Sequence, residues 1–344
     1  MMEPIPYSPG DEVLEPDEVL LFARIVDAMS STAARAPAAG GPGERLSHLK
    51  TLAALEGELR VDGQLAPELA QGLFHKPRRY AVVARLSHLP AERLDDRGVS
   101  SPRGLAIRLL NVDGPPAGEL EVGLHDFVLE TGKAFNAATP RSFLTAFGMV
   151  EAAAALPQGV KAMVSAGAQG ANAVLSKANL HSANLDVLGH PRRHPLSECY
   201  YSQAPIRWGA YVAKLGVFPE GPQAPLEFKA DEAEALRNAI ADWCCSNATE
   251  FVIKAQLRTD AAAMPIEDAS VVWPEELSSY RPVARLVFPP QDPHDVGREV
   301  AVNALAFSPG NAVEAHRGLG GIMRARAHVY GALGAARLKS ARSA

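Results

Sequence analysis

The sequence has little of several features that mark particular classes of protein. It contains three cysteines in 344 residues, Cys199, Cys244 and Cys245. They form no CxxC pair and no even-numbered framework, so neither a zinc knuckle nor a disulfide scaffold is indicated. No apolar run approaches the ~20 residues that a membrane helix needs. The acidic, proline-rich start (MMEPIPYSPGDEVLEPDE) has no basic stretch before an apolar core, unlike a signal peptide. These absences predict a cytoplasmic protein without a membrane span.

Positive charge is also scarce. The chain has 34 Lys and Arg against 39 Asp and Glu, a formal net charge of −5 at pH 7. Binding to nucleic acid needs a broad basic surface, so we expect no nucleic-acid partner. The exception is the last stretch, RARAHVYGALGAARLKSARSA, which has five basic residues, one histidine and no acid between Arg324 and Ala344. A basic end on an acidic chain is a local feature, and the regular positions of its arginines need another explanation.

The chain alternates between strand-like and helix-like segments. Short segments rich in Val, Leu and Ile predict strands over 55–61, 80–87, 104–112, 119–129, 208–218, 250–257 and 284–289. Helical spacing is found over roughly 17–35, within 140–180, over 231–246 and from about Gly321 to Lys339. Strands early and late, with helices between and after them, predict an α+β fold with a closed or strongly curled antiparallel sheet.

No linker divides the chain. We therefore expect an extended N-terminal arm over 1–16 and a single domain over 17–344. Two polar segments lie outside the predicted elements: Asp95 and Asp96 in one turn, and HPRRHP over 190–195. Charged side chains outside strands and helices are mostly solvated, so we expect both segments at the surface.

The closing helix carries a chemically suggestive spacing. Arg326 precedes Tyr330 by one turn and Arg337 follows it by seven residues, which places all three within roughly 40° on one face. A phenol holds its proton to about pH 10, and a nearby guanidinium favours the phenolate, which is an anionic ligand for ferric iron. Taken alone, the spacing is also compatible with a tyrosine that packs and arginines that meet solvent.

A second set of polar residues lies far upstream. In RLSHL, Arg45 precedes His48 by three residues, ahead of the first predicted strand. In ARLSHL, Arg85 and Ser87 lie two apart on the next strand, so their side chains share one face. A serine and a histidine on facing strands can form a hydrogen bond that fixes the imidazole tautomer.

Taken in order, these motifs resemble the haem catalases, and most closely the short catalase-like proteins and peroxidases that lack the extra domains of full-length catalases. RLSHLKTLAALEGELRV resembles the family's R-x-x-H-A-K-x-x-G-x-x-E-F-x-V segment, with Lys50 at the lysine. SPRGLAIRLL resembles D-P-R-G-F-A-x-K-F, and YYSQAPIRWGAY is similar to Y-x-S-Q-x-P-Y-R-x-G-x-Y. RARAHVYGALGAAR resembles the helix that carries the iron ligand. The resemblance covers roughly 17–342.

The resemblance implies a catalase-like antiparallel β-barrel core with surrounding helices and a C-terminal helix on the proximal side of haem b. It implies that His48 is the distal acid and base and that Ser87 supports it. Tyr330 corresponds to the axial ligand of ferric iron, and Arg326 to the residue that keeps it a phenolate. The arginines that correspond to those binding the haem propionates are Arg45, Arg85 and Arg337.

One departure from the family pattern bears on activity. The family's distal asparagine falls at Thr131 or at Glu130, and Gly132 and Lys133 replace part of an aromatic wall. At Thr131, a hydroxyl would stand where an amide donor and acceptor orients a second peroxide. This predicts a peroxidase with weak catalase activity that uses hydrogen peroxide or an organic hydroperoxide and a small reductant.

Two alternatives stay open from the sequence. One is a fatty-acid hydroperoxide lyase or isomerase of the allene oxide synthase type, and the other is a haem- or lipid-binding protein without turnover. The presence of His48 and Ser87 argues against a carrier, which needs no distal base. The extended arm, together with the family's habit, is compatible with a homodimer.

Overall fold

The computed structural model describes residues 2–35, 45–89, 93, 95–98, 100–118, 122–154, 190–221, 224–225 and 230–343. The strands are β1 (Thr51–Val61), β2 (Arg79–His88), β3 (Arg103–Leu110), β4 (Leu124–Glu130), β5 (Tyr200–Tyr201), β6 (Ile206–Trp208), β7 (Tyr211–Glu220), β8 (Thr249–Leu257) and β9 (Arg281–Phe288). The α-helices are α1 (Glu18–Arg35), α2 (Pro140–Ala154), α5 (Ala235–Cys244), α6 (Val296–Ala304) and α7 (Gly320–Ser343). Single 3-10 turns are η1 (Pro9–Asp11), η2 (Gly72–Phe74), η3 (Pro195–Ser197) and η4 (Glu314–His316).

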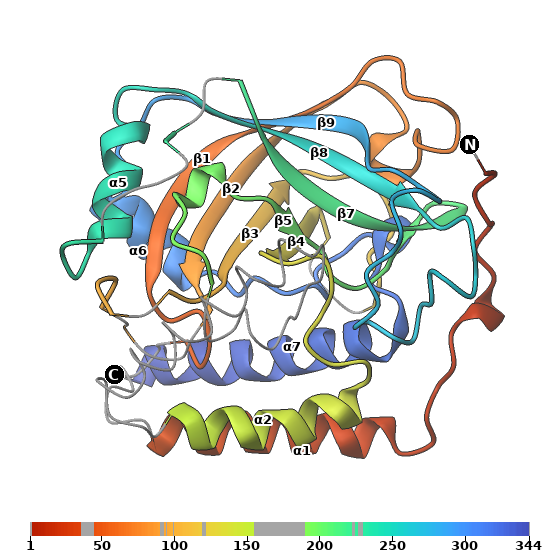
Figure 1. Ribbon diagram of the computed structural model, residues 1–344, viewed down its shortest axis with the longest axis horizontal. Helices are drawn as coiled ribbons and strands as arrows, with labels where there is room; N and C mark the ends of the chain where they lie inside the picture. Colours follow the sequence, from red (N-terminus) through yellow and green to blue (C-terminus); the bar gives the residue numbers. More distant parts are fainter. Residues whose placement is uncertain are drawn as a thin grey trace.

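The strands form one antiparallel sheet that closes on itself (Figure 1). Its order is β5-β4-β3-β2-β1-β9-β8-β7-β6, and the additional pairing of β5 with β7 joins the two ends. Eight of the described strands thus form a closed barrel, and β6 pairs with β7 beside it. The closure is narrow at β5, which pairs with β4 through Glu130 and Tyr201 and with β7 through Tyr200 and Tyr201.

Side chains along each strand point alternately into and out of the barrel, and the inward ones fill its interior. Leu86 on β2, Leu105 on β3 and Leu129 on β4 belong to the large apolar core, each about 1% exposed. Neighbours in sequence point to the opposite face, so Arg85 and Ser87 lie on the outside of the barrel. The outer face of β2–β4 therefore carries polar residues, and a second layer of the protein covers them.

That layer consists of helices. Figure 1 shows α7 running along one side of the barrel, with α1 and α2 beside it, whereas α5 and α6 lie at another side. The N-terminal arm is attached to the beginning of α7, because Glu12 forms ion pairs with Arg317 at 2.7 Å and Arg324 at 2.9 Å. The outer face of the barrel and α7 are thus the two walls between which a site can form.

The predicted α+β class and antiparallel barrel are confirmed, and most predicted elements agree with the structure to within a few residues. The sequence patterns missed α6 and the short strands β5 and β6. A start signal for α6 was present, since Asp295 accepts a hydrogen bond from the backbone N–H of Arg298 at 2.8 Å, as helix N-caps do. Helical spacing beyond residue 154 lies outside the described residues.

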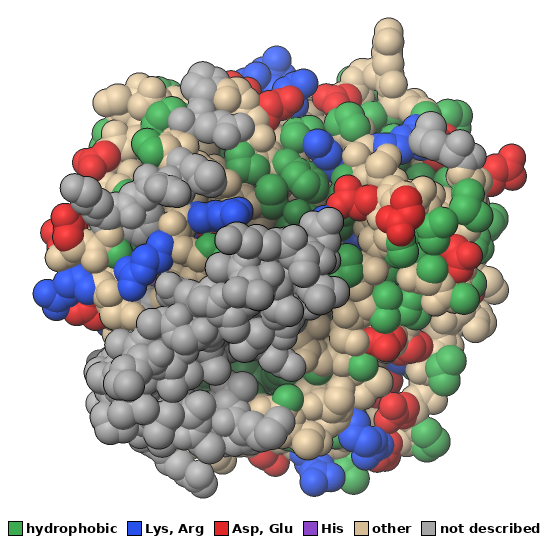
Figure 2. All heavy atoms as spheres, viewed as in Figure 1, with side chains coloured by type: hydrophobic (Ala, Val, Ile, Leu, Met, Phe, Trp, Pro, Cys, Tyr) green, Lys and Arg blue, Asp and Glu red, His purple; other side chains and the backbone are tan. Residues whose placement is uncertain are grey.

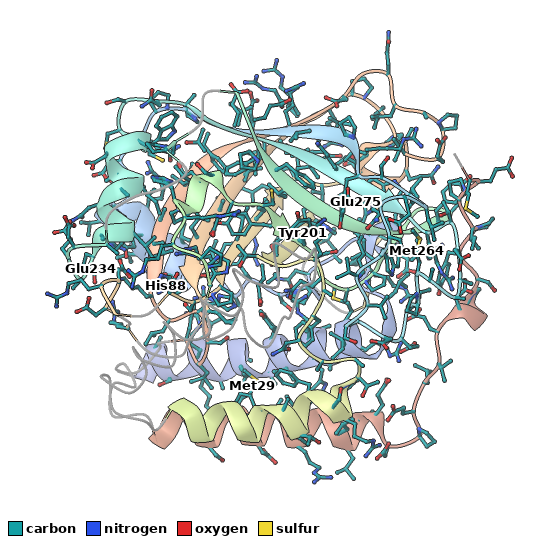
Figure 3. The ribbon with its side chains drawn as sticks, in the orientation of Figure 1. Met29, His88, Tyr201, Glu234, Met264 and Glu275 are labelled. Atoms are coloured by element: carbon teal, nitrogen blue, oxygen red, sulfur yellow. The ribbon has the colours of Figure 1, made fainter. Side chains whose placement is uncertain are left out.

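Two expectations of surface exposure were wrong. Asp96 is 3% exposed, and its carboxylate is 2.9 Å from Nζ of the buried Lys50. His190 and His194 of the HPRRHP segment are also buried, and Glu198 lies 2.6 Å from Nε2 of His190. These groups belong to one polar region near α5, where Figure 3 labels His88 and Glu234. Charge alone misled the prediction, because buried charges are tolerated where each finds a partner.

On the face shown in Figure 2, the described Lys, Arg, Asp and Glu side chains are interspersed. Within the described part of the chain, no helix has both the length and the apolar character needed to cross a membrane.

Candidate active site

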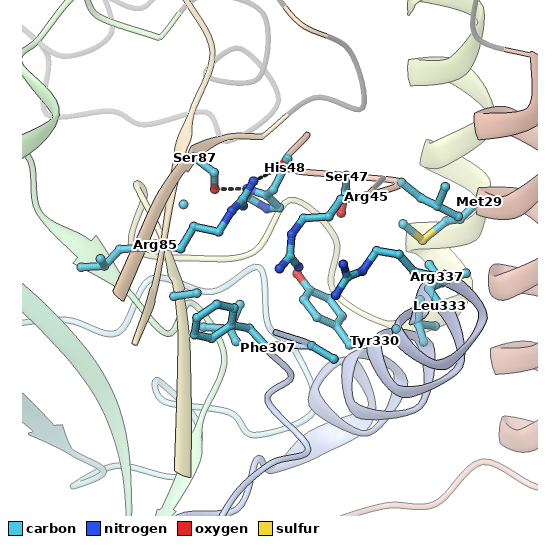
Figure 4. A pocket seen from close by; sticks show the side chains of 18 of the residues that line it. Met29, Arg45, Ser47, His48, Arg85, Ser87, Phe307, Tyr330, Leu333 and Arg337 are labelled. Carbon is cyan, nitrogen blue, oxygen red and sulfur yellow. Dashed lines mark hydrogen bonds between the residues drawn. The ribbon is translucent and has the colours of Figure 1, made fainter. Parts of the chain in front are cut away.

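A pocket lies between the outer face of β2–β4 and helix α7 (Figure 4). Its empty space, including the part open to solvent, is about 760 Å³. The polar side chains that line it are Arg45, Ser47, His48, Arg85, Ser87, Tyr330 and Arg337. Apolar lining comes from Met29, Val128, Phe307, Val329 and Leu333, among others. Segments from both ends of the chain thus meet in one cavity.

One wall of the pocket depends on the strand register. Ser87 on β2 pairs with Gly104 on β3, and Gly104 pairs with Glu130 on β4. Directly paired residues of antiparallel strands point to the same face of the sheet. Ser87, Gly104 and Glu130 therefore form a row on the outside of the barrel, with the side-chain position in the middle left empty by the glycine.

The imidazole of His48 fills that empty position. Its Nδ1 is 3.1 Å from Oγ of Ser87, and its Nε2 is 3.4 Å from Oε1 of Glu130. A Cβ atom on Gly104 would lie only 2.7 Å from the ring. His48 also has a left-handed backbone, with φ of 53°, which is uncommon for a residue with a side chain and is enriched at functional sites.

Thr131 and Glu130, the two positions left open for the distal amide, point in different directions. Oγ1 of Thr131 accepts a hydrogen bond from the backbone N–H of Arg103 at 3.2 Å, and Thr131 does not line the pocket. Glu130 is the residue that reaches His48. Burial acts to raise the pKa of Glu130, but the hydrogen bond and charge of His48, together with the charge of Arg326, outweigh burial and lower it. The group beside Nε2 of His48 is thus a carboxylate.

Three arginines converge at another end of the pocket, on the last turn of α6. Arg45 donates to the carbonyl of Leu305 at 2.6 Å, and Arg337 donates to the carbonyls of Asn303 and Leu305, both at 2.8 Å. Arg85 donates to Oγ1 of Thr51 at 2.8 Å and to Oδ1 of Asn303 at 3.2 Å. The carbonyls at a helix C-terminus carry partial negative charge, which holds guanidinium groups in place.

The hydrogen-bond partners named for Arg45 and Arg85 are uncharged oxygens. Within the described residues, no carboxylate lies at ion-pair distance from Arg45 or Arg85, and Nε of Arg45 is buried without a hydrogen-bond acceptor. Burial and the neighbouring charge of Arg337 lower the pKa of Arg45 to about 10. Burial, together with the charges of Arg45 and Arg337, holds the pKa of Arg85 well below its usual range. Such a cluster is suited to an anionic group that enters from outside the chain.

Helix α7 supplies Tyr330 from the opposite wall. Figure 4 shows its hydroxyl directed toward the side chains of Arg45 and Arg337. Arg326 lies one turn earlier, with its guanidinium 5.8 Å from the Tyr330 ring centre, and donates to the carbonyl of Val128 at 3.1 Å. Burial raises the pKa of Tyr330, and the guanidinium of Arg326 offsets part of that rise. A bound cation would complete the shift toward the phenolate.

The donor set fits a haem better than a bare metal ion. Among the described residues, no three His, Cys, Asp or Glu side chains gather as ligands of one metal ion. Tyr330 offers one oxygen ligand, so a metal bound here would need its remaining ligands from a group such as a porphyrin. Arg45 and Arg85, which have no carboxylate at ion-pair distance among the described residues, match the anionic propionates that a haem b carries. The residues present therefore fit a haem held by Tyr330.

The pocket brings together most of the residues that the sequence singled out. His48, Ser87, Tyr330, Arg45, Arg85 and Arg337 all line it. Arg326 lies behind Tyr330, whereas Thr131 points away. Sequence reasoning did not identify Asn303, which binds Arg85, or Phe307, whose ring lies 5.9 Å from the guanidinium of Arg45. Both depend on α6 and the loop after it, which the patterns had missed.

Comparisons with known proteins bear on the fold. Neither the protein-family models nor the curated protein sequences match this sequence. Solved structures do: a fungal catalase (TM-score 0.63, 16% identity), a bacterial catalase (0.60, 15%) and catalase A from Saccharomyces cerevisiae (0.59, 17%). The matches cover 100%, 97% and 98% of this chain, which spans 66%, 63% and 67% of those catalase chains. The closed barrel and the helices around it therefore have the catalase fold.

Proposed function

We propose that the chain is a haem-dependent oxidoreductase that acts on hydrogen peroxide or an organic hydroperoxide. The observation that carries this proposal is the composition of one pocket: His48 on the barrel side, Tyr330 on the helix side and three arginines at one end. A ferric haem bound there would supply an iron atom that binds a peroxide oxygen and donates electrons to the peroxide as the O–O bond breaks.

The chain's own residues handle the proton. A hydroperoxide gives up a proton when one of its oxygens is bound, and the other oxygen needs a proton in order to leave. His48 is placed for this transfer because Ser87 and Gly104 fix its ring in one position. General acid–base steps of this kind typically contribute ~10²–10⁴-fold to the rate.

The residue beside His48 favours peroxidase over catalase activity. Oxygen evolution requires a second hydrogen peroxide to be oriented next to the imidazole, which an amide with both a donor and an acceptor does well. The neighbour of Nε2 here is the carboxylate of Glu130, which only accepts. A small organic reductant has no need of that orientation, so we expect dye oxidation to exceed oxygen evolution.

The observations count against a carrier without turnover. A carrier needs no histidine whose two ring nitrogens are both engaged and whose backbone is held at a φ of 53°. Product analysis with a fatty-acid hydroperoxide tests the remaining alternative, a lyase or isomerase: rearranged products formed without a reductant would identify that chemistry.

The absorption spectrum of the purified full-length protein tests the proposal first. We expect one ferric haem per chain, and for Tyr330→Phe, which removes the phenol oxygen, a loss of haem or a changed spectrum. Tyr280→Phe is the matched control, because Tyr280 does not line the pocket. If Tyr330→Phe binds haem as fully as the wild type with an unchanged spectrum, Tyr330 is not the ligand.

A further inference from the structure

The backbone of His48 has a conformation that needs support from its surroundings. Its φ of 53° lies in the left-handed region, which is uncommon for a residue with a side chain and persists only where neighbouring contacts hold it. Contacts hold both the N–H and the C=O of His48. The N–H donates to the carbonyl of Leu89 at 2.9 Å, directly after β2, and the C=O accepts from Arg85 on β2. The turn that places the imidazole against Gly104 is thus held on both sides of one residue.

The guanidinium of Arg85 binds two consecutive carbonyls of this turn. Its Nη2 lies 2.7 Å from the carbonyl oxygen of His48 and 3.3 Å from that of Leu49. Both residues precede β1, whose pairing with β2 begins at Thr51, so among the described residues the strand ladder supplies no donor to their carbonyls. Carbonyls that are withdrawn from water need a donor from elsewhere, and a charged donor forms the stronger hydrogen bond.

Arg85 is itself held in place. Oγ1 of Thr51 accepts from Nη2 of Arg85 at 2.8 Å and from its Nε at 3.1 Å, and donates to Oδ1 of Asn303 at 2.8 Å. A hydroxyl has one hydrogen and two lone pairs, so all three contacts can form at once. The side chain of Arg85 is buried, at 3% exposed. A line of hydrogen bonds therefore runs from the end of α6 through Thr51 and Arg85 to the backbone of His48.

We propose that Arg85 is a positioning residue for His48: its guanidinium holds the left-handed turn that keeps the imidazole against Gly104. The inference rests on the proposed function and adds to it a residue that acts on the proton-transfer group through the backbone. Arg85 also lines the pocket together with Arg45 and Arg337, so one guanidinium connects the cationic end of the pocket with the histidine. When Arg85 is removed, two carbonyls of the turn lose their donor, and we expect the ring to leave its place against Gly104.

The position of the ring can be measured without haem. In haem-free full-length protein with ¹⁵N-labelled histidine, the ring signals of His48 are identified by their loss in His48→Gln. We expect Arg85→Met to shift these signals toward those of an exposed histidine such as His75. Arg45→Met is the matched control, because Arg45 donates to carbonyls at the end of α6 and not to the backbone of His48. Unmoved His48 signals in a folded Arg85→Met protein, or an equal shift in Arg45→Met, would overturn the proposal.

A pair of variants at Thr51 decides the question if Arg85→Met does not fold. Thr51→Val keeps the shape of the side chain and removes the hydroxyl that Arg85 binds, whereas Thr51→Ser keeps the hydroxyl. We expect the His48 signals to shift in Thr51→Val, in the direction given for Arg85→Met, and to keep their wild-type positions in Thr51→Ser. Equal His48 spectra in the two variants would overturn the proposal.

Turnover of the haem-loaded protein gives a second readout. Peroxide turnover per bound haem should fall in Arg85→Met by ~10²–10⁴-fold, the usual contribution of a general acid–base group. Turnover at the wild-type level in this variant would overturn the positioning role. The two proposals fail separately: if the wild-type protein binds no haem while the His48 signals shift as expected, the proposed function is refuted and the positioning role of Arg85 stands.

Discussion

The imidazole of His48 lies directly against the backbone of Gly104, so closely that a Cβ atom there would come within 2.7 Å of the ring. The backbone of Gly104 is not in the left-handed region. Glycine is required at this position because a side chain would collide with the ring of His48. The strand pairing places this gap between Ser87 and Glu130, the two side chains that His48 contacts. A glycine in the middle of a strand thus determines where the ring of His48 sits.

Gly104→Ala should displace that ring and lose peroxide turnover about as severely as His48→Ala, by ~10²–10⁴-fold, while haem binding through α7 is retained. Steady-state dye oxidation and haem content measure the two effects separately. Gly331→Ala is the control, since a Cβ there meets no atom within 4 Å. Turnover within a few-fold of wild type in Gly104→Ala would show that the ring position is unimportant.

Arg45→Met should have opposite effects on stability and on haem affinity. The half-buried Arg45 has a buried Nε without an acceptor and no counter-ion among the described residues, and Leu305 keeps its bond to Arg337 when Arg45 is removed. We expect the haem-free protein to gain about 1–2 kcal/mol in free energy of unfolding, because the variant no longer has to take a charge without a counter-ion out of water. Haem should bind more weakly. Urea unfolding of haem-free protein and haem titration measure these changes, and a destabilised variant would contradict this account.

Acid should destabilise the fold through its buried neutral histidines. Burial lowers the pKa of His316 to about 4, whereas an exposed histidine titrates near 6.5. Between these values the unfolded state binds the extra proton, so stability falls as the pH is lowered from about 6.5 toward 4. The slope is about 1.4 kcal/mol per pH unit for this group. Burial also holds the pKa of His125 well below its usual range, which adds to the effect.

Urea unfolding at pH 7 and pH 5 measures this dependence. His316→Gln keeps an acceptor for the backbone N–H of Leu73, which His316 binds at 3.0 Å. In this variant the free energy of unfolding should depend less steeply on pH, by the contribution of one histidine. His75→Gln, at an exposed position, should leave the slope unchanged. An unchanged slope in His316→Gln would mean that another group is responsible for acid sensitivity.

Lys50→Met should be strongly destabilising. It would leave Asp96 buried without the ammonium 2.9 Å away, and breaking a buried ion pair from one side costs about 3–5 kcal/mol. Combining Lys50→Met with Asp96→Asn should recover part of that loss, because the asparagine oxygen can still accept from the backbone N–H of Leu236, now bonded at 2.9 Å. Urea unfolding of the single and double variants tests this, and a double variant no more stable than Lys50→Met would argue against a charge effect.

The sequence predicted the site residues whose positions follow from local spacing. Arg326 and Tyr330 share a face of α7 because they lie one helical turn apart. Arg85 and Ser87 share a face of β2 because they lie two residues apart on a strand. The order of the motifs predicted the catalase-like barrel, and the structure confirmed that fold. Local periodicity sufficed for these residues because each relationship lies within one element.

Relationships between elements were decided by the tertiary structure. Thr131 and Glu130 are adjacent, so a shift of one residue exchanges the inward and outward faces, and the pairing of Gly104 with Glu130 placed the carboxylate at His48. Asn303 reached Arg85 through a helix that the pattern did not reveal. Asp96 is buried because Lys50, 46 residues earlier, lies beside it. The spacing of residues in the sequence reveals which side chains share a face of one strand or helix. Strand register, burial and charge pairing depend instead on which distant segment packs against that element.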